Sequence, residues 1–137
     1  MSLFSVFDIS MSAMSAQSVR LNTISSNLAN AEVISSDPES TYKAKYPIFS
    51  TVYSDSISGA ESMGVKVTDI MESTLAPQKR YSPGHPSADA EGYIYQSNVN
   101  TVDEMANMIS ASRSYQSSVE AMNATKQLIM RTLSLGS

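Results

Sequence analysis

Both ends of this chain lack glycine and proline, and this absence constrains its fold more than any other feature. Residues 3–31 and 99–135 contain neither residue, whereas all five prolines lie between residues 38 and 86. Each uninterrupted end can form one continuous helix, because nothing in it breaks the backbone hydrogen-bond ladder. The sequence therefore predicts two long terminal helices separated by an insert of different structure.

Apolar residues recur along the first stretch at the heptad spacing of a helical seam. The remaining face carries mostly serine, glutamine and asparagine. The residues assigned to this seam are Phe7, Met11, Met14, Leu21, Ile24 and Leu28.

The last stretch repeats the design, although Ser112 and Lys126 interrupt its seam. Asn100 or Thr101 can cap the start of this helix, and Asp103 and Glu104 then lie favourably in its first turn. The seam residues assigned here are Met105, Met108, Tyr115, Val119, Met122, Ile129 and Leu133.

Short runs of β-branched and aromatic residues between breakers predict strands at residues 48–53, 64–70 and 93–95. Residues 33–41 are expected to form a loop, since serines precede Asp37 and Pro38. The predicted fold is mainly α with a small β-rich insert, its terminal helices packing as a coiled-coil-like pair.

The corresponding domain prediction is an N-terminal core helix at 1–31, a middle domain at 32–98 and a C-terminal core helix at 99–137. The helix pair could form within one chain, as an antiparallel hairpin, or between chains. The methionines and small polar residues of both ends favour close packing against several neighbours.

Charge is distributed unevenly. The net charge of −4 lies entirely between residues 31 and 98, and both ends are neutral. No strongly basic patch occurs, which argues against nucleic acid and anionic membranes as partners. The N-terminus lacks the basic region of a cleavable signal peptide, and no apolar run is long enough to span a bilayer. From the residues alone, the expected location is the cytoplasm.

Catalysis is not expected. His85 is the only histidine and cysteine is absent, so neither a thiolate metal site nor a disulfide can form. No nucleophile elbow or phosphate-binding loop accompanies His85, which lies between Gly84 and Pro86 in a predicted tight turn. We expect no enzyme, no catalytic or metal-ligating residue and no cofactor.

Three segments carry a resemblance to a known family. Residues 25–31 read SSNLANA, residues 81–100 read YSPGHPSADAEGYIYQSNVN, and the chain opens MSLF. The chain resembles the flagellar axial proteins, and within them the proximal-rod branch. It departs from many of them at residues 32–36, where EVISS replaces a T-x-G-Y type stretch.

The resemblance implies a structural rod subunit whose terminal helices form the inner core of a helical tube that transmits torque. It implies export through the flagellum's own type III pathway without a cleavable signal, and assembly in the periplasm. The implied partners are other copies of the chain, other rod proteins and the export apparatus.

Two questions stay open at the level of sequence. Asn27 and Asn30 could bond neighbouring subunits or could terminate the helix locally. A helical adaptor or secretion chaperone is the alternative function, because amphipathic helices also bind partner helices. An adaptor would be folded alone, whereas the serine-rich ends of a rod subunit would become ordered on assembly.

Overall fold

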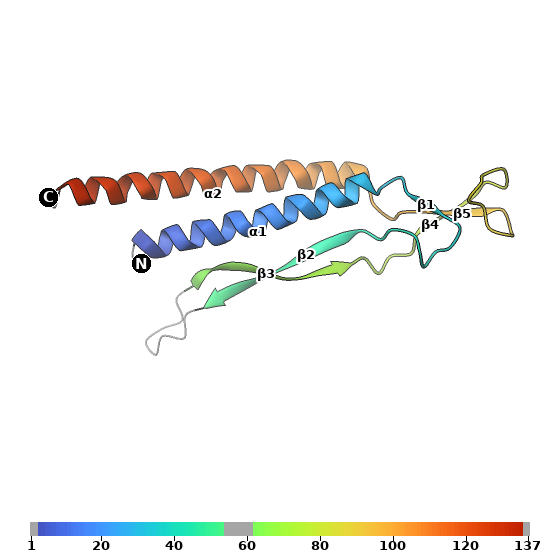
Figure 1. Ribbon diagram of the computed structural model, residues 1–137, viewed down its shortest axis with the longest axis horizontal. Coiled ribbons are helices and arrows are strands. Elements are labelled where there is room, and N and C mark those ends of the chain that lie inside the picture. Colours follow the sequence, from blue (N-terminus) through green and yellow to red (C-terminus); the bar gives the residue numbers. More distant parts are fainter. Residues whose placement is uncertain (1–2, 54–61, 136–137) are drawn as a thin grey trace. The chain divides into compact units, whose positions relative to one another are not determined.

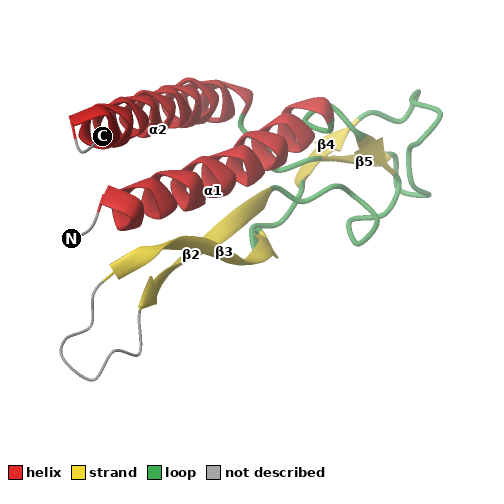
Figure 2. Cartoon of the chain, turned by 60° about the vertical axis from the view of Figure 1, so that its left-hand side comes forward, coloured by secondary structure: helices red, strands yellow, loops and turns green. Residues whose placement is uncertain are grey.

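The computed structural model describes residues 3–53 and 62–135, which contain two terminal helices and a β-containing insert (Figures 1 and 2). Helix α1 spans Leu3–Ala29 and helix α2 spans Thr101–Leu135. The strands are β1 (Ile34–Ser35), β2 (Lys45–Tyr53), β3 (Ser62–Glu72), β4 (Gln78–Tyr81) and β5 (Tyr93–Gln96). The predicted combination of terminal helices and a small β insert is confirmed.

Asparagines define the helix ends that face the insert. The Asn100 Oδ1 atom accepts hydrogen bonds from the N–H groups of Val102 (3.0 Å) and Asp103 (3.4 Å), so Asn100 caps α2. At the end of α1, the Asn30 N–H bonds to the carbonyls of Ser26 and Asn27, both at 3.2 Å. Of the two cap residues that the sequence offered, Asn100 and Thr101, the structure uses Asn100.

The strands form two separate sheets. Strands β1, β5 and β4 make an antiparallel sheet in that order, with Ile34 opposite Gln96 and Tyr81 opposite Tyr93. Strands β2 and β3 pair as a two-stranded ribbon. The predicted strands correspond to β2, β3 and β5, whereas β1 and β4 were missed. Strand β1 has only two residues, and all four residues of β4 are exposed, so neither presents an alternating pattern.

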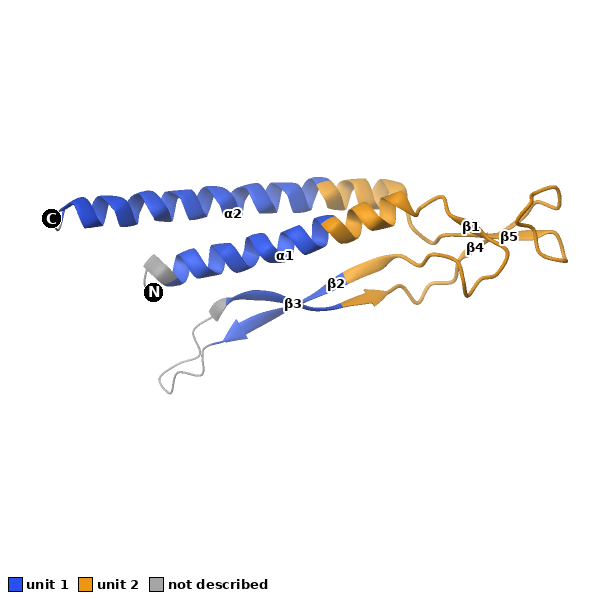
Figure 3. Ribbon diagram, viewed as in Figure 1, with its two compact units in different colours: residues 1–21, 47–69, 109–137 blue, residues 22–46, 70–108 orange. Residues whose placement is uncertain are grey.

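The chain divides into two compact units (Figure 3). Unit 1 contains residues 1–21, 47–69 and 109–137, and unit 2 contains residues 22–46 and 70–108. Each unit includes part of both helices and part of the insert.

In unit 1, the outer parts of α1 and α2 run antiparallel and side by side (Figures 1 and 2). Strand β3 approaches α1 closely, because Gly64 lies against Ser12. The Ser12 Oγ atom accepts a hydrogen bond from the Val65 N–H (3.1 Å) and donates one to the Ile9 carbonyl (2.8 Å). Gly64 has a φ of 133°, a conformation that favours glycine.

In unit 2, a small apolar core lies where the inner helix ends meet the insert. Ala31, Ala44 and Val99 are buried together, and Tyr42 packs against them. The Asn98 side chain accepts a hydrogen bond from the Ala44 N–H (2.8 Å) and donates one to the Leu75 carbonyl (2.7 Å). Polar contacts therefore surround this core and connect the segments that build it.

Candidate assembly interface

The apolar residues predicted for the interface in unit 1 are only partly covered within the chain. Met11 and Leu133 are exposed by 51% and 66%. The others are half-buried: Phe7, Met14, Leu21, Tyr115, Val119, Met122 and Ile129. Additional large apolar side chains on α2, including Leu128 and Met130, are also exposed.

Apart from Ile24, Asn27 and Glu104, the side chains that the helices bury are small. On α2, Glu104, Ala111 and Thr125 are buried and follow a heptad line that also includes the half-buried Ser118. On α1, the corresponding buried line includes Ser10, Ile24 and the adjacent Ala16. Small residues allow helices to approach closely, so the chain buries them and leaves larger apolar groups near its surface.

In unit 2, the predicted interface residues have different environments. Ile24 and Asn27 are buried, and Leu28, Asn30 and Met108 are half-buried. Met105 is 57% exposed. The prediction that these residues contact other subunits stays a prediction, and Asn27 has a distinct role within the chain.

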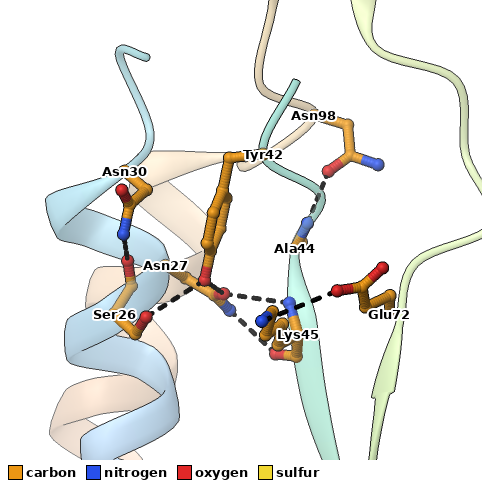
Figure 4. Close-up of polar contacts among 8 residues, drawn as sticks. All are labelled: Ser26, Asn27, Asn30, Tyr42, Ala44, Lys45, Glu72 and Asn98. Carbon is orange, nitrogen blue, oxygen red and sulfur yellow. Dashed lines mark hydrogen bonds and ion pairs between the residues drawn. The ribbon is translucent and has the colours of Figure 1, made fainter. Parts of the chain in front are cut away.

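The Asn27 side chain is completely buried and makes four hydrogen bonds (Figure 4 shows those to Tyr42 and Lys45). Its Nδ2 atom donates to the Lys45 carbonyl (2.9 Å) and to Glu104 Oε2 (3.1 Å). Its Oδ1 atom accepts from the Lys45 N–H and the Tyr42 hydroxyl, both at 2.9 Å. One amide therefore joins the end of α1, the start of β2 and the start of α2.

Glu104 is buried with 3% of its surface exposed, which is unusual for a carboxylate. Its second oxygen, Oε1, accepts a hydrogen bond from Asn107 Nδ2 (3.4 Å). The Lys45 ammonium pairs with Glu72 instead, at 3.5 Å (Figure 4). Amide donors therefore satisfy this buried carboxylate.

Asn30 makes a local bond, because its Nδ2 atom donates to the Ser26 carbonyl one turn earlier (2.8 Å; Figure 4). This is the helix-terminating role considered for both asparagines from the sequence. The two residues of the same motif thus differ: Asn30 bonds within its own helix, and Asn27 bonds to two other segments.

Tyr46 lies close to this acidic start of α2. Burial raises the pKa of its phenol, and the negative charges of Glu104 and Asp103 raise that pKa further. The neutral phenol is therefore the favoured form beside these carboxylates.

His85 belongs to a loop that is ordered by its own polar groups. Its Nδ1 atom accepts a hydrogen bond from the Ser87 N–H (3.1 Å). Asp89 Oδ1 accepts from the N–H groups of Glu91 (3.0 Å) and Tyr93 (2.8 Å). The loop therefore positions the start of β5.

Sequence reasoning missed the partners of Asn27. Glu104 was assigned only a favourable place beside the helix dipole, and Lys45 was given no role. The available signal was the position of Asn27, a polar residue between the apolar Ile24 and Leu28. That position predicts a buried amide but does not identify its partners.

Two further properties concern residues 3–53 and 62–135. Neither helix in this part of the chain is long and apolar enough to cross a membrane. The same residues contain no group of three or more histidine, cysteine, aspartate or glutamate side chains that could hold a metal ion.

Two family models match the segments that contain these helices. The model described as the flagella basal body rod protein matches residues 7–33. The C-terminal model of the flagellar basal body rod FlgEFG proteins matches residues 90–135. The segments that contain the terminal helices therefore place the chain in the class of flagellar basal-body rod proteins.

Full-length relatives identify the family. The flagellar basal-body rod protein FlgC of Escherichia coli O157:H7 is 46% identical over 136 residues, and that of Salmonella typhimurium is 44% identical. FlgC of Bacillus subtilis is 35% identical over 149 residues. Each alignment covers 99% of both chains. The chain belongs to the FlgC family of flagellar basal-body rod proteins, which are structural proteins and not enzymes.

Proposed function

We propose that this chain is a structural subunit of the proximal rod, and that its terminal helices pack in a coiled-coil-like manner to build a tube that transmits torque. The observation that carries this proposal is the similarity to FlgC proteins over 99% of the chain. Its partners are other copies of itself and other rod proteins.

The surface of unit 1 supports helix packing as the mode of assembly. Large apolar residues on α2 are exposed by more than half, including Ile109 at 57% and Leu133 at 66%. Exposed large apolar side chains support an interaction surface, because their burial against a partner is favourable. Neighbouring helices in a tube would cover these side chains. The interface comprises the seam residues named above, with Met122 near the middle of the C-terminal seam.

The same proposal includes the route to the rod. The chain would be exported by the flagellar type III apparatus without a cleavable signal peptide and would assemble in the periplasm. Marginal helices suit this route, since most helical stability comes from tertiary packing. The two outer helical segments become ordered when they meet their neighbours.

A pair of adjacent substitutions tests the interface. Met122→Asp places a charge on the half-buried seam, whereas Asn123→Asp adds the same charge at an exposed position one residue away. In a bacterium that carries the variant as its only copy, we expect Met122→Asp to reduce incorporation into purified basal bodies at least tenfold. Asn123→Asp should be incorporated like the unmodified chain.

Equal incorporation of both variants would contradict packing through this seam. Absence of the unmodified chain from purified basal bodies, together with its presence in complexes with other exported subunits, would favour the adaptor or secretion chaperone instead.

A further inference from the structure

The Asn27 amide has no remaining hydrogen-bonding capacity for another molecule. A side-chain amide offers two N–H donors and one carbonyl oxygen with two lone pairs. All four are used within unit 2, and the side chain is completely buried. Asn27 therefore acts inside the subunit.

Each bond of Asn27 fixes a different segment. Bonding to both the N–H and the carbonyl of Lys45 reproduces the pattern of backbone pairing and holds the start of β2. The bond to Glu104 holds the first turns of α2, although 77 residues separate the two side chains. The two residues come from the two separate segments that the rod family models match.

These contacts also make the burial of Glu104 possible. Removing a carboxylate from water is costly unless donors replace its hydration. Asn27 and Asn107 supply such donors. The nearby core of Ala31, Ala44 and Val99 is likewise complete within unit 2. Nothing in this network requires a second copy of the chain.

We propose that Asn27 is a positioning residue that holds the inner helix ends, residues 22–29 and 101–108, in a unit that folds before assembly. Ordering on assembly is then confined to unit 1, whose described residues are 3–21, 47–53, 62–69 and 109–135. This inference goes beyond the proposed function and does not rest on it, because it concerns the unassembled chain.

Amide hydrogen exchange on the purified, unassembled chain tests this inference. The Lys45 N–H is a direct probe, since it donates to Asn27 Oδ1. We expect exchange at Lys45 and at residues 104–108 to be at least tenfold slower than in the outer part of α2, residues 109–135. Fast exchange at residues 104–108 in the unmodified chain would overturn the proposal.

Two variants in the same motif separate the role of Asn27 from a general effect of charge. In Asn27→Asp, an oxygen replaces the amide nitrogen that donates to the Lys45 carbonyl and to the Glu104 carboxylate. Both hydrogen bonds are lost, and the new oxygen faces two other acceptors. We expect protection at Lys45 and residues 104–108 to fall at least tenfold. Asn30→Asp should preserve it, because the Asn30 side chain donates to the Ser26 carbonyl of its own helix and not to β2 or α2. Equal effects of the two substitutions would overturn the proposal.

If Asn27→Asp also unfolds strands β4 and β5, the loss of protection could come from general unfolding. Two variants of Glu104 then test the same contact from its other side. Glu104→Ala removes only the α2 arm, so it should release residues 104–108 while Lys45 stays protected. Glu104→Gln keeps an acceptor for Asn27 and loses only the longer bond from Asn107, so it should reduce protection of residues 104–108 less than Glu104→Ala does. Unchanged protection of residues 104–108 in Glu104→Ala would contradict the positioning role. None of these measurements depends on rod assembly.

Discussion

In unit 2 side chains bond between distant segments, whereas in unit 1 many hydroxyl groups bond within their own helix. Ser10, Ser118 and Thr125 each donate to the carbonyl four residues earlier, at 2.9 to 3.0 Å. Such bonds satisfy the hydroxyl but do not fix one helix against another. By contrast, Asn27 and Asn98 connect segments separated by 18 to 77 residues.

The buried polar atoms of the two units differ in the same sense. In unit 2, the amide of Asn27 is fully satisfied. In unit 1, the buried Gln17 Oε1 has no hydrogen-bond partner among the residues that the structure describes. An unsatisfied buried acceptor costs about 1–3 kcal/mol. The difference indicates that contacts within the chain are enough to stabilise unit 2, while unit 1 depends on packing against other molecules.

The largest effect is expected at the contact between α1 and β3 in unit 1. A Cβ atom at position 64 would clash with Ser12 Oγ, and Gly64 has a φ of 133°. Gly64→Ala should therefore destabilise assembled unit 1 by about 2–4 kcal/mol, from the steric clash and the backbone strain together. We expect loss of incorporation into basal bodies, with no change in the unfolding curve of the free chain.

Gly84→Ala is the matched control, because a Cβ added there would have no atom within 4 Å among the described residues other than its chain neighbours. It should assemble normally. A lower free energy of unfolding for the free Gly64→Ala chain would show that unit 1 folds before assembly, and the contrast between the units would then fail.

Asn98 provides the opposite test in unit 2. Asn98→Ala removes the acceptor of the Ala44 N–H and the donor to the Leu75 carbonyl. We expect the free energy of unfolding of the unassembled chain to fall by about 1–3 kcal/mol, as measured by urea denaturation. Asn123→Ala, an exposed substitution in the outer part of α2, should leave it unchanged. Equal unfolding midpoints would mean that unit 2 is not yet folded in the free chain.

The sequence predicted the elements of unit 1 better than the contacts of unit 2. Helix α1 was predicted from the heptad of Phe7, Met14 and Leu21, because helical periodicity can be recognised within a single stretch of sequence. Strand β4 was missed because Gln-Lys-Arg-Tyr carries no alternation and pairs with a distant partner. The bond between Asn27 and Glu104 joins residues 77 apart. No local pattern in a single sequence identifies such a pair.

The predicted seams and the buried residues of the helices coincide at Ile24 and differ at most other positions. Methionine and leucine dominated the predicted faces, yet Ala16 and Ala111 are the more deeply buried residues. Helices that approach closely bury small residues, and a pattern of large apolar residues does not identify these. The larger apolar groups are half-buried or exposed, and their contact with other subunits stays a prediction.

The smallest expected effect concerns Tyr46 and alkaline pH. Because burial, Glu104 and Asp103 raise the pKa of its phenol, the folded chain holds this proton more tightly than the unfolded chain. The stabilisation is present below the unfolded pKa of about 10 and is lost as pH rises above it. Tyr46→Phe should therefore reduce the loss of unfolding free energy between pH 9 and 11, and Asp103→Asn should reduce it less. The effect is small because Tyr46 is 48% exposed.

Urea denaturation at each pH measures this effect. If the free energy of unfolding of Tyr46→Phe falls with pH as steeply as that of the unmodified chain, Tyr46 does not lie beside the acidic start of α2 in solution. That result would argue against a folded unit 2 in the free subunit.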